Sequence, residues 1–414
     1  MEPTKSSSNS FKNLFSKLKS VDSLLKLVFI AGLIIFMLSL FMFRFELLAN
    51  LNMLEIKRLE HVSPLRSLLE MPYDLFNGLL QNLSLKALPS HKIIGLRLPT
   101  LLMLSSSLVF IASSLYIKFR NRYLPYTYLL LAATSPLIIL LSHQGFLPGI
   151  DLLFFSSFIV LSFLVITATT VRPSIKKIFL IKGAFALGML TLQPAGIPIA
   201  LISAFIISRS TELRYQIIGF KKLAPALSML AVVIALSLNV LVSIKNHDFI
   251  KITSGYEIIK SYKDIGFAAL ESLKTIFRIG DSNGFDIGTN RPNLLLIGAL
   301  SLTIYEAIKK RHARMTLLIF FTISIFISAL YQQMGSIVLP AVIAPTLIAL
   351  ALANMVRIID VAFPINPYPR NIAKVLILIL ITSLASLNLY VFTTATVRQN
   401  TPQTVNLKLQ NFKD

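Results

Sequence analysis

Acidic side chains at the ends of apolar stretches are the residues of this 414-residue chain best placed to do chemistry. Glu46 follows an apolar stretch at 25–43, and Asp151 opens another at 151–170. A carboxylate at such a position can take a proton from a reacting hydroxyl. It can equally be structural, because Glu46 can pair with Arg44 and Asp151 can cap the helix that it opens. Both interpretations stay open at this point.

Arginines near the same boundaries could bind an anion. Arg97 precedes one apolar stretch, and Arg278 and Asp281 precede another at 293–308. A guanidinium group can hold a phosphate through two parallel hydrogen bonds. The structural alternatives are that Arg97 snorkels to a membrane interface and that Arg278 and Asp281 form a salt bridge.

Two uncharged groups could add hydrogen bonds to a substrate. His143 lies in a turn, where a solvated histidine is the simpler interpretation, and Gln193 lies in a segment interrupted by proline. The five histidines are scattered and show no metal-ligand spacing. Oxygen ligands from Glu46 and Asp151 could hold a divalent metal, although nothing in the sequence requires one. No phosphate-binding loop or dinucleotide-binding glycine pattern occurs.

The composition indicates a membrane protein. The chain is 55% hydrophobic and 14% charged, with a mean hydropathy of +0.74. Apolar stretches of about 17–25 residues can cross the hydrocarbon core as helices. The net charge of +22 comes from basic residues near span ends. Anionic lipid head groups are therefore the expected partner, and nucleic acid is not.

Basic residues gather at alternate junctions between the apolar stretches, and such clusters are retained on the cytoplasmic side during insertion. The alternation predicts a multi-pass plasma-membrane protein of about eleven helices, with the N-terminus in the cytoplasm and the C-terminus outside. The basic clusters are Lys118/Arg120/Arg122, Arg172/Lys176/Lys177, Arg209/Arg214/Lys221/Lys222 and Lys309/Lys310/Arg311/Arg314. The predicted spans are 25–43, 99–117, 124–142, 151–170, two short helices in a hairpin within 178–208, 225–243, 293–308, 315–331, 336–356 and 371–392.

The predicted domain organisation is all-α: a cytoplasmic basic tail over 1–24, a transmembrane domain over 25–392 and an outer tail over 393–414. The transmembrane domain has two large outer segments, 45–98 and 244–292. Apolar positions in the first of them recur with helical spacing, which predicts interfacial helices within 47–59 and 65–88.

Five short motifs occur in order along residues 25 to 355. Together they resemble the GT-C-fold membrane glycosyltransferases, especially the protein mannosyltransferase and aminoarabinose transferase group. The motifs are Pro72-Tyr73-Asp74-Leu75-Phe76, Gly95-Leu96-Arg97-Leu98-Pro99-Thr100, Ser135-Pro136 with Asp151-Leu152-Leu153, Leu187-Gly188 to Gln193-Pro194, and Phe277-Arg278-Ile279-Gly280-Asp281.

The resemblance implies transfer of a sugar from a polyprenyl-phosphate donor to a lipid, protein or glycan acceptor at the outer membrane face. Such enzymes have an acid, usually aspartate, at the start of the first outer loop, and Glu46 is the acid nearest to that place here. A second acid follows the third span, which corresponds to Asp151. For such a reaction the candidate donor-binding residues are Arg97, Arg278, Asp281 and Gln193, although Gln193 could equally meet the acceptor, and the candidate acceptor-side residues are His143 and Glu55.

Two other functions compete with sugar transfer. A non-catalytic relative could keep the fold as a lipid- or glycan-binding scaffold. A transporter would be expected to carry ionisable residues inside its spans. The predicted spans contain few such residues, mainly Lys182 and Glu306, which argues against ion-coupled transport.

Overall fold

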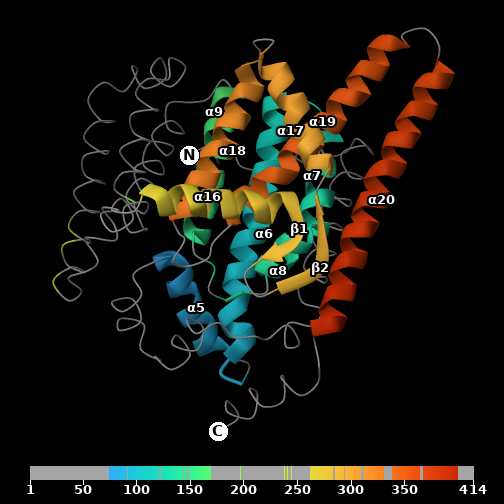
Figure 1. Ribbon diagram of the computed structural model, residues 1–414. Coiled ribbons are helices and arrows are strands. Elements are labelled where there is room, and N and C mark those ends of the chain that lie inside the picture. Colours follow the sequence, from blue (N-terminus) through green and yellow to red (C-terminus); the bar gives the residue numbers. More distant parts are fainter. Residues whose placement is uncertain are drawn as a thin grey trace, which may run out of the picture. The chain divides into compact units, whose positions relative to one another are not determined.

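The computed structural model in Figure 1 describes part of the chain. The described residues are 74–90, 92–119, 121, 123–142, 144–145, 147, 149–168, 196, 237, 240, 244, 262–282, 285–292, 294–308, 312–330, 338–363 and 367–399. They all belong to one compact unit, Phe45–Asp414. The predicted first span and the predicted interfacial helix at 47–59 lie outside the described residues. Only isolated positions of 178–208 and 225–243 are described, so the hairpin and that span stay predictions.

The described residues are mainly helical and strongly apolar. Helix α6 (Lys92–Phe119), helix α19 (Val338–Ala362) and the Tyr368–Tyr390 part of α20 (Pro367–Gln399) are long and apolar enough to cross a membrane. A helix satisfies most of its backbone hydrogen bonds internally, as hydrocarbon requires. The remaining helices are α5 (Leu75–Ala87), α7 (Tyr123–Thr134), α8 (Pro136–Ser142), α9 (Ile150–Ala168), α16 (Tyr262–Phe277), α17 (Leu294–Ile308) and α18 (His312–Leu330).

Helices α9, α17, α18, α19 and α20 occupy the chain segments in which the sequence predicts spans. Helix α6 begins at Lys92 and runs through Pro99, where the predicted span began. The helical membrane character is therefore confirmed in part. The number of spans and their orientation stay predictions.

The predicted span 124–142 consists of two helices, and Pro136 explains why. Proline has no N–H, so it cannot continue the hydrogen-bond ladder of α7. The N–H of Ser135 instead donates to Ala132 O at 3.2 Å, which closes α7 with a tighter turn. Pro136 then occupies the first position of α8, where its missing N–H costs nothing.

The segment 244–292, predicted to lie outside, contains a β-hairpin that the all-α prediction did not include. Strand β1 (Arg278–Ser282) pairs antiparallel with β2 (Phe285–Pro292). Arg278 lies opposite Pro292, and the register shifts between Ile279 and Asp281. Helix α16 leads directly into this hairpin, and α17 follows it (Figure 1).

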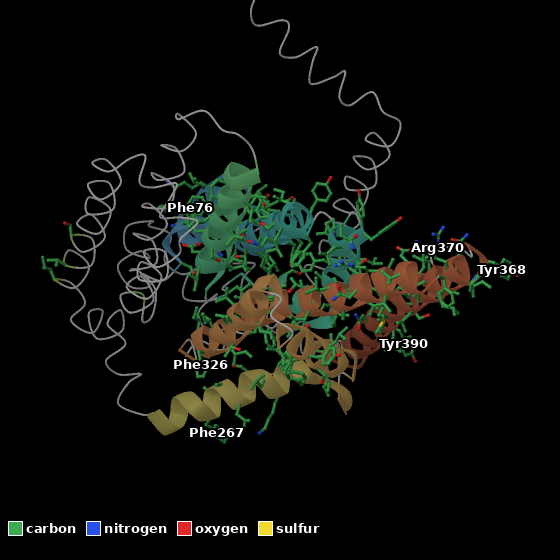
Figure 2. All side chains as sticks on the ribbon, turned by 90° about the horizontal axis from the view of Figure 1, so that it is seen from above. Phe76, Phe267, Phe326, Tyr368, Arg370 and Tyr390 are labelled. Atoms are coloured by element: carbon green, nitrogen blue, oxygen red, sulfur yellow. The ribbon has the colours of Figure 1, made fainter. Side chains whose placement is uncertain are left out.

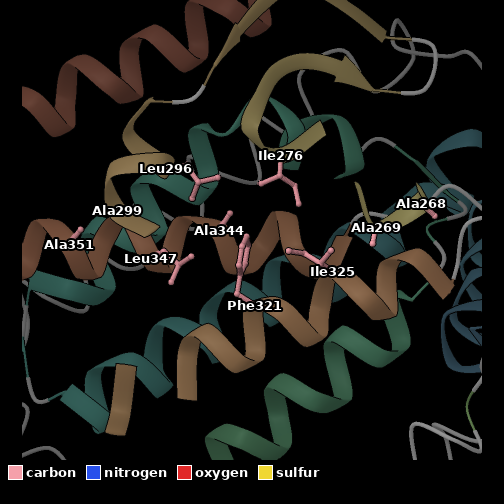
Figure 3. Close-up of a cluster of buried hydrophobic side chains, with 10 residues drawn as sticks. All are labelled: Ala268, Ala269, Ile276, Leu296, Ala299, Phe321, Ile325, Ala344, Leu347 and Ala351. Carbon is pink, nitrogen blue, oxygen red and sulfur yellow. The ribbon is translucent and has the colours of Figure 1, made fainter. Parts of the chain in front are cut away.

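A buried apolar cluster joins α16 to α17, α18 and α19 (Figure 3). Half of its members are alanines, and small residues let helix backbones approach closely in a membrane protein. Helix α16 therefore packs on these helices through its alanine-rich face. The cluster consists of Ala268, Ala269, Ile276, Leu296, Ala299, Phe321, Ile325, Ala344, Leu347 and Ala351.

Close packing of α5 on α6 depends on Gly95. A Cβ at this position would lie 3.3 Å from Leu85 Cα and 3.3 Å from Ser84 O, which is tighter than ordinary contact. Gly95→Ala should therefore lower the free energy of unfolding by about 1–3 kcal/mol. Gly298→Ala is the matched control, since no atom lies within 4 Å of its built Cβ. Thermal unfolding in detergent measures both, and equal melting temperatures for the two variants would contradict the prediction.

Candidate functional site

Two buried aspartates, Asp74 at the start of α5 and Asp151 in the first turn of α9, each accept hydrogen bonds from the N-terminus of the other's helix. Asp74 stands at the N-cap of α5, yet its side chain makes no capping bond to that helix. Its Oδ2 accepts the N–H of Gly149 at 3.1 Å, and its Oδ1 accepts the N–H of Asp151 at 3.2 Å. The carboxylate of Asp74 therefore serves the N-terminus of α9, 75 residues further along the chain.

Asp151 makes the reciprocal contact. Its Oδ2 accepts the N–H of Phe76 at 2.8 Å, and its Oδ1 accepts the N–H of Asn77 at 3.0 Å. These amides are among the first of α5, which have no partner inside the helix. The sequence alternative in which Asp151 is a cap is therefore correct in kind. The amides that it accepts through these two bonds belong to α5, the helix of the other aspartate.

The exchange supplies hydrogen bonds to two carboxyl groups that are shielded from water. Asp74 and Asp151 are each 1% exposed. A buried carboxylate is costly unless hydrogen bonds compensate the lost hydration. Here four backbone amides donate to the two groups, and each helix N-terminus adds roughly half a positive charge.

Backbone geometry brings the carboxylates into place. Asp74 adopts the left-handed conformation, with φ 50° and ψ 53°, which aspartate tolerates better than most residues. Gly149, at the start of α9, has a φ of 85°, which favours glycine. The chain therefore turns sharply before both helices, and each turn presents its amides to the other segment.

A network of neutral polar side chains continues from the aspartates into the bundle. Asn77 Nδ2 donates to Thr100 Oγ1 at 3.1 Å, and Thr100 lies on α6. Gln81 Nε2 donates to Leu96 O at 2.8 Å and also to Gly145 O. The Asn77, Gln81 and Thr100 side chains are almost fully buried. They tie α5, the start of α6 and the turn before α9 into one unit.

Aromatic rings cover one side of this polar network. The ring of Phe76 stacks on Phe154 with centroids 6.0 Å apart and contacts Phe155 at 5.4 Å. Phe110 of α6 packs against Phe154 at 5.7 Å and Phe158 at 5.5 Å. Phe76 thus donates its amide to Asp151 and packs its ring against α9, beside which it lies in Figure 2.

Arg97 lies inside α6, one turn before Thr100, and is 1% exposed. The alternative in which Arg97 extends to an open interface does not fit this burial. The reason is that α6 starts at Lys92, so Arg97 is within the helix and packed by it. Arg97 and Thr100 are three residues apart and therefore share one face of α6.

The structure describes the other predicted site residues only in part or not at all. Arg278 and Asp281 are placed on β1 by their backbone, and their side chains are not described. For Asp151, in contrast, the structure gives the hydrogen-bond partners of the side chain. Glu46, Glu55, His143 and Gln193 lie outside the described residues.

Sequence reasoning missed Asp74, Asn77, Gln81 and Thr100 as site residues. Asp74 belongs to the first of the five motifs, but the motif predicts no chemical function for it. A signal was present, because Asn77 and Gln81 are four residues apart and share one face of α5. The contact with Asp151 spans more than 70 residues, so no local pattern could reveal it.

Within the residues that the structure describes, no group of three or more His, Cys, Asp or Glu side chains could hold a metal ion. Comparison with known proteins found no matching family model, curated protein or solved structure. The fold and the geometry of the site therefore carry the functional argument.

Proposed function

We propose that the chain is a membrane glycosyltransferase that moves a sugar from a polyprenyl-phosphate donor to a lipid, protein or glycan acceptor at the outer membrane face. The observation that carries the proposal is the reciprocal contact of Asp74 and Asp151. It joins the first of the five motifs to the acid after the third predicted span. The ordered motifs are the second support.

The assignment of roles follows from burial and hydrogen bonding. Both oxygens of Asp151 already accept amide bonds, so we give it a positioning role. Acceptor activation then falls to Glu46, the acid after the first predicted span. Arg97 is too buried to meet a donor without rearrangement. We therefore assign the donor phosphate to Arg278 and not to Arg97.

The remaining predicted contacts complete the proposal. Gln193 and Asp281 would lie on the donor side, and His143 and Glu55 on the acceptor side. A divalent metal at Glu46 would assist acceptor activation through oxygen ligands. The orientation, with the N-terminus in the cytoplasm, belongs to the same proposal and rests on the alternating basic clusters.

A non-catalytic lipid- or glycan-binding protein is the second candidate. The hydrogen bonds of Asp151 favour this candidate. Both oxygens of Asp151 accept backbone amides, so the carboxylate is not available to take a proton from an acceptor. Purified protein in lipid nanodiscs, supplied with radiolabelled polyprenyl-phosphate sugar and an envelope lipid extract, separates the two. Labelled product supports the transferase. Donor binding without product from any acceptor supports the alternative.

Arg278→Ala should weaken donor binding about tenfold or more, because a charge-assisted bond to phosphate is lost. Arg291→Ala is the matched control. Arg291 lies on the same hairpin, opposite Ile279, and carries the same charge. Filter binding of the labelled donor measures both variants. Equal losses would indicate general attraction by the hairpin and would contradict a specific role for Arg278.

A further inference from the structure

A compact set of charged residues lies where α19 connects to α20. Lys374 Nζ is 2.7 Å from Asp360 Oδ1, which joins the two helices. Arg357 lies one turn before Asp360 on α19, and Arg370 lies one turn before Lys374 on α20. Residues three or four positions apart share a helix face. Three cations and one anion therefore gather on adjoining faces.

The cations of this set have unused hydrogen-bonding capacity. The Nε atom of Arg370 is buried, and no residue that the structure describes accepts a hydrogen bond from it. A guanidinium stays charged and offers five N–H donors in a fork that suits phosphate. Arg357 is exposed. Asp360 neutralises Lys374 alone, so two positive charges remain for an external anion.

The surroundings of these cations are apolar and open. Ile358 is 58% exposed, Val361 is 72% exposed and Ile372 is 46% exposed. Tyr368, which is 75% exposed, lies beside Arg370 at the same end of α20 (Figure 2). An exposed apolar surface around a charged group is typical of a membrane interface.

Two tyrosines on α20 indicate where that interface lies. Tyr368 and Tyr390 bound an apolar segment of 23 residues. At 1.5 Å per residue this segment is about 33 Å long, which matches the thickness of the hydrocarbon core. Tyrosine is enriched at both membrane–water interfaces. The cations near Tyr368 therefore lie at head-group level.

We propose that Arg357, Arg370 and Lys374 form a binding site for the phosphate of an anionic membrane lipid. The phosphate oxygens accept hydrogen bonds from Arg370, and the acyl chains lie against the exposed apolar side chains of α19 and α20. A free phosphate ion would gain nothing from those side chains. A lipid is bound by both parts, and basic pockets between membrane helices suit such head groups. The site is separate from the proposed sugar transfer.

The test is lipid retention in native mass spectrometry. Protein in neutral detergent is titrated with phosphatidylglycerol or phosphatidylcholine. The parent should retain phosphatidylglycerol preferentially, and Arg370→Gln should weaken that retention about fivefold, since one cation near a membrane surface contributes roughly that factor. Lys86→Gln is the matched control. Lys86 is an exposed cation on α5, and its loss should change nothing.

Asp360→Asn supplies a result of opposite sign. Removing the carboxylate frees Lys374, so retention of phosphatidylglycerol should increase. Asp360 and its partner are 43% and 36% exposed, so this variant should keep the fold. Equal retention of the two lipids by the parent would overturn the proposal, as would parent-like retention by Arg370→Gln or weaker retention by Asp360→Asn. Displacement of the lipid by millimolar inorganic phosphate would overturn the lipid as ligand.

Discussion

Asp151→Ala should lower the free energy of unfolding by about 3–5 kcal/mol, because two buried amides of α5 lose a charged acceptor. Asp74→Ala should cost a similar amount, since the amides of Gly149 and Asp151 lose theirs. Alanine at position 74 would in addition adopt a left-handed conformation that it disfavours. The chain has no tryptophan, so unfolding in mixed micelles is best followed by circular dichroism.

The double variant makes the prediction specific to the exchange of caps. Each aspartate accepts two amide bonds from the N-terminus of the other's helix. When one single variant removes two of these bonds, the N-termini of α5 and α9 can move apart, and this movement also weakens the other two bonds. The double variant should therefore cost less than the sum of the single variants, by about 1 kcal/mol or more. Asp360→Ala is the matched control for the two single variants, because it also removes a carboxylate, but an exposed one. Its exposed ion pair with Lys374 should contribute at most about 1 kcal/mol.

Additive losses would show that the two carboxylates act independently and would contradict reciprocal capping. Asp74→Asn refines the test. Asparagine tolerates the left-handed conformation and keeps one carbonyl acceptor, so it should lose only one of the two bonds. A loss equal to that of Asp74→Ala would mean that backbone strain, and not hydrogen bonding, dominates at this position.

The helices that the sequence predicted well are those whose apolar length decides the structure. Helices α17, α18 and α19 begin within a few residues of the predicted spans, because long apolar runs must satisfy their backbone internally. Their limits were harder to predict. Helix α6 runs through Pro99, and tertiary packing against α5 and α9 can support a helix that local propensity would end there.

The β-hairpin and the polar network depended on contacts that local patterns do not encode. Strand β1 is five residues long and shows no alternation of apolar and polar residues, so the usual sequence pattern of a strand is missing. Thr100 belongs to the second motif and to the predicted span 99–117, and neither of them indicates its hydrogen-bond partners. Its role follows only from its bonds to Asn77 and Gly145, which come from separate segments.

The largest expected effect on activity is at Glu46. Under the proposed function, Glu46→Gln should reduce sugar transfer by about 10²–10⁴-fold, because the carboxamide keeps the shape of the side chain but cannot take the acceptor proton. Donor binding should stay near the parent value, since the donor phosphate is assigned to Arg278. Single-turnover transfer and equilibrium binding, measured on the same preparation, test both statements.

Asp151→Asn distinguishes a proton acceptor from a positioning residue. If Asp151 only orients α5 and α9, asparagine should lower stability and activity together, and a lower assay temperature that restores folding should restore much of the transfer. Loss of stability cannot explain the effect of Glu46→Gln, which should persist at every temperature at which the variant is folded. Parent-rate transfer by Glu46→Gln would remove Glu46 from the mechanism. If Asp151→Asn were instead fully folded and inactive, Asp151 would be the proton acceptor, and its two amide bonds would have to open during turnover.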